Sequence, residues 1–296
     1  MRRPGQTVPT KRLSLADVTS KGKGLPSRLI LHGVEGVGKS SFAAFAPLPI
    51  FMMARGETGL ETLIDSGRLH DVPHFPEIGS WEDLIGGIET LIHEQHTYKT
   101  LVIDTLNGAE RLCHESVCAR LFNNDWGKQG FTSYQQGFEA SLADWRQLLF
   151  LLDQLREQKR MAIICLCHSK VKTFKNPEGA DFDRYAPDMH DKTWGLTHKW
   201  SDIVLFAKFE TIVTGGSVPE GSVKAGKKGK GVGGQTRMMF SERHASYDAK
   251  NRNGLPEEIE MGDSGKAAWS NFLTALKSGK AVVANSEKTE AGKAVA

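Results

Sequence analysis

The stretch RLILHGVEGVGKS, residues 28–40, decides the fold of this chain. Its first five residues are typical of a short buried strand, and they run straight into a glycine-rich loop. That loop, GVEGVGKS from Gly33 to Ser40, matches the pattern G-x-x-x-x-G-K-[ST], and residues 41–45 behind it are expected to be helical. A strand, this loop and a helix in that order predict a phosphate-binding site.

The residue types in the loop each serve that chemistry. Glycines at 33, 36 and 38 let backbone N–H groups approach phosphate oxygens, where a Cβ atom would obstruct them. Lys39 is expected to reach the β- and γ-phosphates of ATP, and Ser40 to offer its hydroxyl to Mg²⁺ at the start of the helix. A glycine turn with a solvated lysine is the alternative, which the flanking elements disfavour. The predicted nucleotide-binding residues are Gly33, Val34, Glu35, Gly36, Val37, Gly38, Lys39, Ser40 and Ser41.

An acid follows another expected strand, TLVID at residues 100–104. A carboxylate at the carboxyl end of a strand beside the loop can hold Mg²⁺ through water, which makes Asp104 the candidate. An aspartate that only caps the next helix is the alternative. Ser40 and Asp104 are therefore the predicted metal ligands, and ATP and Mg²⁺ the predicted cofactors.

Hydrolysis also needs a group that orients or deprotonates water. Glu57 follows the second expected strand, residues 49–54, and would face the γ-phosphate if the strands are neighbours. Glu61 is its rival, and either one is otherwise a solvated loop acid. His168 ends the apolar run at residues 161–168, where a polar group can sense the γ-phosphate, or alternatively can simply cap a strand.

Apolar strands alternate with helical patterns along the rest of the chain. Expected helices at residues 81–96, 110–122 and 136–159 separate the strands, which predicts an α/β fold with a mainly parallel sheet covered on both faces. Residues 202–213 and 235–243 frame a Gly/Lys-rich tip at 215–234 and predict an antiparallel C-terminal hairpin. The polar segment 169–199 has few strand signals.

Composition and charge limit the domain organisation and the binding surfaces that the chain can have. The 296 residues have a net charge of only +3, so any nucleic-acid surface must be local. We expect a basic flexible arm at residues 1–24, one domain at 25–275 and a disordered tail at 276–296. No run is long and apolar enough for a membrane span or a signal core. The cysteines lack metal-ligand spacing, which favours buried thiols in a reducing cytoplasm: Cys113, Cys118, Cys165 and Cys167.

The order of these motifs, ending in AKNRNGLP at residues 249–256, resembles that of the RecA-like ATPases. The similarity is specifically to short phage-encoded AAA-type nucleotide-binding proteins associated with single-strand annealing and recombination, and it spans residues 25–261. It implies a RecA-like fold for the domain, ATP hydrolysis, and a ring or filament of identical subunits with ATP at their interfaces. By the same resemblance, Lys250 and Arg252 would reach the γ-phosphate of the neighbouring subunit. A polar turn before Pro256 is the alternative.

Two departures from the family pattern bear on the catalytic residues. Many relatives place an acid directly after the second strand, whereas this chain has ARGE, with Arg55 first and Glu57 two residues later. A histidine, His168, stands where many relatives have a glutamine. The assignment of the catalytic glutamate depends on the first departure.

The resemblance also implies two single-stranded-DNA loops, at residues 123–134 and 169–199. Aromatic faces beside cations suit sequence-independent binding of single strands, and the Gly/Lys-rich tip suits phosphate contacts. A solvated flexible loop is the alternative for the tip. The candidate DNA-binding residues are Trp126, Lys128, Phe131, Tyr134, Lys170, Lys172, Lys224, Lys227, Lys228 and Lys230.

The sequence therefore favours a Mg²⁺-ATP-dependent protein that binds single-stranded DNA and promotes annealing or recombination, in the cytoplasm of a bacterial host if phage-encoded. A single-strand-binding protein is a further partner that the resemblance suggests. A helicase- or loader-type motor shares the same ATP site and is the main alternative. A small-molecule kinase is disfavoured because no lid segment with clustered arginines is evident, and a module that binds nucleotide without hydrolysing it is the fourth candidate.

Overall fold

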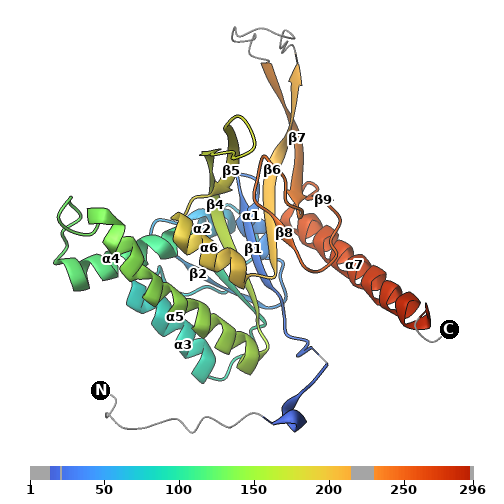
Figure 1. Cartoon of the computed structure of the whole chain (residues 1–296), viewed down its shortest axis with the longest axis horizontal. Helices are drawn as coiled ribbons and strands as arrows, with labels where there is room; N and C mark the ends of the chain where they lie inside the picture. The colour runs from blue at the N-terminus through green and yellow to red at the C-terminus, as the bar shows by residue number, and fades with distance from the viewer. Residues whose placement is uncertain (1–13, 21, 215–229, 294–296) are drawn as a thin grey trace.

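The structure is a computed structural model, and it describes residues 14–20, 22–214 and 230–293. Within these residues nine strands form one sheet, in the order β2-β3-β4-β1-β6-β7-β9, with β5 paired to β4 and β8 paired to β6 (Figure 1). The strands are β1 Arg28–Gly33, β2 Pro49–Met53, β3 Thr100–Asp104, β4 Ala162–Phe174, β5 Phe182–Pro187, β6 Ile203–Thr214, β7 Lys230–Phe240, β8 Lys250–Asn251 and β9 Glu258–Glu260. The helices are α1 Lys39–Ala43, α2 Gly59–Asp65, α3 Trp81–His93, α4 Leu106–Phe122, α5 Gln136–Lys159, α6 Asp191–Trp200 and α7 Gly265–Lys293.

The five central strands are parallel, and the later strands are antiparallel. Strand β1 pairs in parallel with β4 on one side and β6 on the other, and β3 lies between β2 and β4. Strands β6 and β7 form the antiparallel hairpin that projects from the body in Figure 1. The predicted fold class is confirmed in its architecture: this is an α/β fold with helices on both faces of a mainly parallel sheet and an antiparallel C-terminal hairpin.

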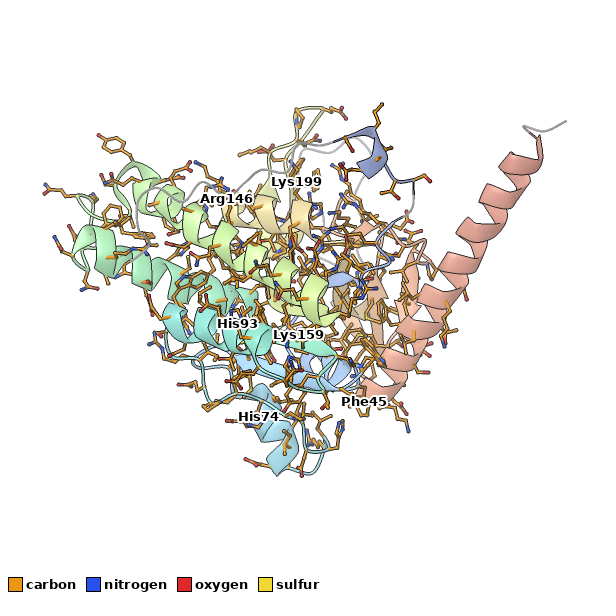
Figure 2. All side chains as sticks on the ribbon, turned by 90° about the horizontal axis from the view of Figure 1, so that it is seen from below. Phe45, His74, His93, Arg146, Lys159 and Lys199 are labelled. Carbon is orange, nitrogen blue, oxygen red and sulfur yellow. The ribbon has the colours of Figure 1, made fainter. Side chains whose placement is uncertain are left out.

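Alternate residues of the central strands face opposite layers, so both faces of the sheet are apolar. On β1, Ile30 joins the core under α3, α4 and α5, whereas Leu29 and Leu31 join the core under α1 and α7. Figure 2 shows the first of these layers from below, with Lys159 labelled at the end of α5 and His93 at the end of α3. The Lys159 ammonium donates a hydrogen bond to the carbonyl oxygen of Glu94, the residue after α3, at 2.7 Å and so joins the two helices. The strands are thus fixed between two packed helical layers.

Several element boundaries differ from the predictions. Helix α4 begins at Leu106 rather than at residue 110, because the Thr105 hydroxyl accepts the backbone N–H of Gly108 and caps it. The polar segment 169–199 forms the end of β4, strand β5 and helix α6, because β4 and β5 pair as a hairpin beyond the core, where apolar alternation is not needed. The four cysteines are buried and free, as predicted.

The C-terminal residues also differ from expectation. The sequence predicted a disordered tail from residue 276, whereas α7 continues to Lys293. Leu276 packs against the core beside Phe272, which ties the helix to the domain beyond the predicted boundary. The residues that follow include several good helix formers, alanine, lysine and glutamate, which can continue a helix that packing has started. None of the helices in the described ranges is long and apolar enough to span a membrane.

Candidate nucleotide-binding site

Parallel pairing brings the predicted site residues to one edge of the sheet, the edge formed by the carboxyl ends of β1, β3 and β4. Gly33 of β1 is in register with His168 of β4, and Asp104 of β3 is in register with Leu166 of β4. Residues from three separate strands therefore converge where β1 enters the glycine loop. We call this the nucleotide edge.

The loop has the backbone that a phosphate cradle needs. Gly36 and Gly38 have φ angles of 72° and 97°, in the left-handed region that side chains disfavour. A Cβ atom on Gly36 would point into open space, which leaves room in front of the loop. A Cβ atom on Gly33 would lie 2.3 Å from the carbonyl oxygen of Ala207, so only glycine lets β1 pass this close to β6.

Lys39 lies folded back on the loop. Its ammonium donates to the carbonyl oxygens of Gly33 at 3.0 Å and Val34 at 3.1 Å, and the side chain is buried. Burial lowers the pKa of this lysine, and the nearby carboxylate of Asp104 opposes the shift. A buried cation held only by neutral carbonyls is well matched to an incoming phosphate anion.

Ser40 and Asp104 form the pair expected for a divalent cation. The Ser40 hydroxyl donates to Asp104 Oδ2 at 2.7 Å, and Asp104 is only 6% exposed. Burial raises the pKa of Asp104 to about 6, and the hydrogen bond from Ser40 opposes that shift. A hydroxyl and a carboxylate at this distance are oxygen ligands of the kind Mg²⁺ takes in nucleotide sites, so these residues fit the cation.

Glu57, rather than Glu61, lies with the other site residues. Thr105 Oγ1 donates to Glu57 Oε1 at 2.8 Å, and His168 Nε2 lies 3.5 Å from Glu57 Oε2. The hydrogen bond to His168 lowers the pKa of Glu57, and the same contact raises the pKa of His168. Glu61 is exposed on α2, with Oε1 3.8 Å from His74 Nε2.

Arg55, which follows the second strand in the sequence ARGE, does not join Glu57 and His168 at the nucleotide edge. Arg55 donates through Nη2 to both carboxylate oxygens of Glu115 on α4, at 2.9 and 2.8 Å. That ion pair occupies Arg55 on the exposed side of α4, while Glu57 turns to the nucleotide edge. The departure from the family pattern therefore shifts the glutamate along the chain and still leaves a glutamate at the site.

Arg237 is a residue at the loop that sequence reasoning missed. From β7 its guanidinium donates to the carbonyl oxygen of Gly262 through Nε at 3.1 Å and Nη2 at 2.6 Å, and through Nη1 to that of Val37 at 3.5 Å. A Cβ atom on Gly38 would lie 2.8 Å from Nη1. No local motif marks this arginine, because the contact joins positions 200 residues apart.

Lys250 and Arg252 lie away from the loop of their own chain. Strand β8 pairs with the start of β6, opposite Ile203 and Val204, whereas the glycine loop adjoins β6 at Ala207. The Lys250 ammonium donates to the carbonyl oxygens of His198 at 2.5 Å, Ser201 at 2.6 Å and Lys199 at 3.3 Å. Arg252 is exposed.

The first predicted DNA loop is divided by burial. Phe131 is fully buried against Val117, Cys118 and neighbouring aromatic rings, so the hypothesis that it stacks on bases is wrong. Phe131 is part of the core because the loop folds back onto the end of α4. Tyr134 is fully exposed and Trp126 is 44% exposed, and Lys128 is exposed beside them.

The lysines of the β4–β5 hairpin are not free cations. Lys170 pairs with Asp188 at 2.9 Å, and Lys172 pairs with Asp191. Both lysines are exposed and paired, so a phosphate contact by either would compete with a local acid, and their role in DNA binding stays a prediction. Of the remaining candidates, Lys230 begins β7 opposite Thr214, and Lys224, Lys227 and Lys228 lie outside the described residues.

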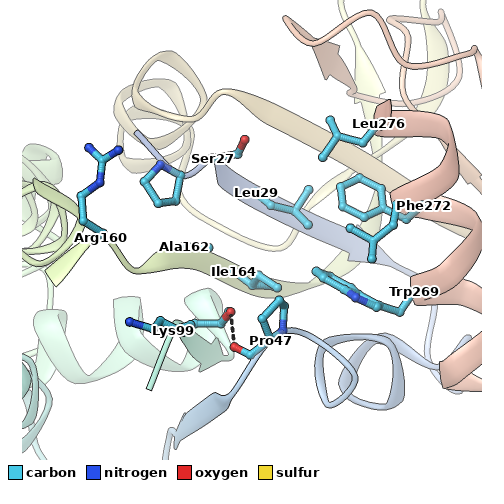
Figure 3. Close-up of a pocket in the computed structure, with 13 residues that line it drawn as sticks. Ser27, Leu29, Pro47, Lys99, Arg160, Ala162, Ile164, Trp269, Phe272 and Leu276 are labelled. Carbon is cyan, nitrogen blue, oxygen red and sulfur yellow. Dashed lines mark hydrogen bonds between the residues drawn. The ribbon is translucent and has the colours of Figure 1, made fainter. Parts of the chain in front are cut away.

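A separate pocket of about 280 Å³ lies at the opposite edge of the sheet (Figure 3). Leu29, Ala162 and Ile164 form its floor near the starts of β1 and β4, and Trp269 and Phe272 of α7 overhang it. None of the predicted site residues lines it. The nucleotide edge and this apolar pocket are therefore distinct features of the fold.

Comparison with known proteins gives a family match over the part of the chain that contains the nucleotide edge. A protein-family model described as AAA domain matches residues 25–253. No curated protein matches the chain. Among solved structures, the crystal structure of the RadB recombinase is similar with a TM-score of 0.43 at 11% identity, over 82% of this chain and 90% of that one. The family model spans the glycine loop, Asp104, Glu57 and His168, and the chain belongs to this AAA-domain family.

Proposed function

We propose that the protein binds and hydrolyses Mg²⁺-ATP, binds single-stranded DNA, and promotes annealing or recombination in phage DNA metabolism. The observation that carries the proposal is the convergence at the nucleotide edge: a glycine loop with Lys39, a Ser40–Asp104 pair at 2.7 Å, and Glu57 held between Thr105 and His168. These are the parts that phosphoryl transfer to water requires.

Each of these side chains has a defined task in that reaction. Bound Mg²⁺ would supply charge neutralisation at the phosphates, with Ser40 and Asp104 to hold it. Lys39 would exchange its two carbonyl partners for phosphate oxygens. Glu57 would orient the attacking water and accept its proton, because its carboxylate already sits at this edge with one oxygen held by Thr105.

His168 is suited to report the state of the γ-phosphate. It contacts Glu57 through Nε2, and its backbone N–H donates to Asn107 Oδ1 at 3.1 Å. Strand β4 continues from His168 to Phe174 and forms the β4–β5 hairpin. A shift of the imidazole on hydrolysis would therefore act directly on that hairpin.

Arg252 is proposed to complete the site of a neighbouring subunit in a ring or filament. The proposal is supported by the exposure of Arg252 and by its place at the end of the sheet away from its own loop, which leave its guanidinium accessible to another subunit. A guanidinium supplied in this way would stabilise transition-state charge and make hydrolysis depend on assembly.

Subunit mixing tests the ATP site and the trans role together. Arg252→Ala and Lys39→Ala should each be nearly inactive alone, because each lacks one part of every composite site. Mixed in equal amounts, they form some interfaces with an intact Lys39 and an intact Arg252, and we expect ATP hydrolysis to exceed the sum of the separate rates severalfold. Rates that only add would contradict the trans role, and ATP binding by Lys39→Ala with wild-type affinity would contradict the loop assignment.

The exposed aromatic residues beside Lys128 support DNA binding. Tyr134 and Gln135 have φ angles of 44° and 59°, an uncommon left-handed conformation for residues other than glycine. That backbone presents the ring of Tyr134 fully to solvent, where a base could stack on it. Trp126 supplies a second, partly exposed ring in the same loop.

A further inference from the structure

Helix α6 is held at both ends by polar side chains from other elements. At its start, the Glu110 carboxylate of α4 accepts the backbone N–H of His190, at 3.1 Å to Oε1 and 3.0 Å to Oε2. At its end, the Lys250 ammonium donates to the carbonyl oxygens of His198 and Ser201 at 2.5 and 2.6 Å. The cation at the C-terminus complements the helix dipole, and the Glu110 carboxyl at the N-terminus satisfies a backbone N–H in either protonation state.

These contacts satisfy backbone groups that a helix end leaves without partners. Glu110 is 6% exposed and Lys250 is half-buried, so both work where water screens them less than at the surface. The hydrogen bonds of the Lys250 ammonium are charge-assisted, and such bonds are stronger than neutral ones. The two contacts therefore fix the position of α6 and of the elements that supply them.

The two ends of α6 lead to different parts of the proposed ATP machinery. Helix α4, which carries Glu110, begins directly after Asp104 and Thr105 at the nucleotide edge. Strand β8, which carries Lys250, leads directly to Arg252. Between them, Trp145 of α5 donates through Nε1 to Thr197 Oγ1 at 2.8 Å and holds the middle of α6.

We propose that Lys250 is a positioning residue, which anchors the turn bearing Arg252 to the end of α6 in its own subunit and does not reach the neighbour's ATP. Because both of its ends are held, α6 links two parts of the ATP machinery. One is the start of α4, at the nucleotide edge of the same subunit, and the other is Arg252, which would contact the ATP of the next subunit. The part concerning Arg252 rests on the proposed function. The anchoring itself does not, since it is made within one chain.

Hydrogen exchange on the nucleotide-free full chain tests the anchoring. Lys250→Met keeps most of the aliphatic stem and removes the donors, so amide exchange in residues 197–201 and 248–254 should become at least about tenfold faster. Lys250→Arg, which can still donate to the carbonyls, should remain close to wild type. Lys199→Met is the matched control: it removes an exposed cation from the same helix end (Figure 2) and should leave amide exchange in the nucleotide-free chain unchanged.

Two outcomes would overturn the proposal. Unchanged exchange in Lys250→Met would show that the contact does not anchor the turn. The hydrolysis rate of Lys250→Arg gives the other: a positioning role predicts that this variant retains most of the wild-type rate, and a loss as large as that of Arg252→Met would contradict it. If mixing of Arg252→Ala with Lys39→Ala restores no activity while exchange still rises in Lys250→Met, the trans role fails and the anchoring stands.

Discussion

The contact between Glu57 and His168 joins the group proposed to orient water to the residue that ends the apolar part of β4. The hydrogen bond that His168 donates to the Glu57 carboxylate is the largest influence that raises the pKa of His168, and burial of the imidazole works in the opposite direction. The charge of each partner therefore depends on the other. This makes the pair a sensitive probe of the site.

Glu57→Gln should lower the pKa of His168, because burial then acts without the compensating carboxylate. Titration of the imidazole C–H resonances by NMR measures the shift, and His32, which bonds to Ser169 and the backbone of Asp248 instead, is an internal control that should not move. The same variant should bind ATP but hydrolyse it about 10²–10⁴-fold more slowly. An unchanged His168 titration, or hydrolysis at the wild-type rate, would contradict these roles.

Residues within the local motif were predictable, and those that depend on long-range contacts were not. Lys39, Ser40 and Asp104 could be placed because a strand, a glycine loop and a terminal acid fix their positions. The hydrogen bonds of Lys250 to carbonyl oxygens of its own chain depend on where α6 ends, 50 residues earlier in the sequence. Tyr134 could not be separated from the buried Phe131, since both are aromatic residues in one polar loop.

At the scale of elements, α6 depends on a buried acid. Burial raises the pKa of Glu110 to about 7, and the hydrogen bonds from Thr193 and from the His190 backbone only partly oppose this. The folded state thus favours protonated Glu110, so the stability it contributes is present below about pH 4.5 and is lost as the pH rises through 7.

Glu110→Gln removes this dependence, because glutamine can still accept a hydrogen bond from the His190 N–H but does not ionise. We expect the variant to gain stability over wild type as the pH rises from 5 to 8, by the order of 1–3 kcal/mol. Thermal unfolding of both proteins across that range measures the difference. The exposed Glu89→Gln on α3 is the control, and parallel curves for Glu110→Gln and wild type would contradict the prediction.

The elements that were hardest to predict are those outside the central core. Strands β1, β3 and β4 can be recognised in the sequence as apolar runs, because helices cover both of their faces. The β4–β5 hairpin lies beyond that cover, and its cross-strand pairs, such as Lys172 with Arg184, carry no apolar alternation. Helix α7 extends past its apolar anchor, Leu276, into a sequence whose composition alone also suits a tail.

At the scale of the whole molecule, the fold places different tasks at different ends. The nucleotide edge holds the phosphate loop, the loop with Tyr134 lies at the far end of α4, and the turn with Arg252 lies at the other end of the sheet. A protein arranged in this way is expected to hydrolyse ATP efficiently only when neighbours and DNA are both engaged. The mainly parallel α/β architecture was predictable from the alternation of apolar strands and helices, whereas the order of the strands in the sheet and the paired lysines of the β4–β5 hairpin were not.

The most direct test of this account is the rate of ATP hydrolysis at low salt with and without single-stranded DNA of mixed sequence. The wild-type protein should be stimulated at least severalfold, Tyr134→Ala should require more DNA for the same effect, and the exposed Phe150→Ala on α5 should behave as wild type. Lys39→Ala should remain inactive with DNA. A wild-type rate that single-stranded DNA leaves unchanged, with no DNA complex at low salt, would contradict the central claim.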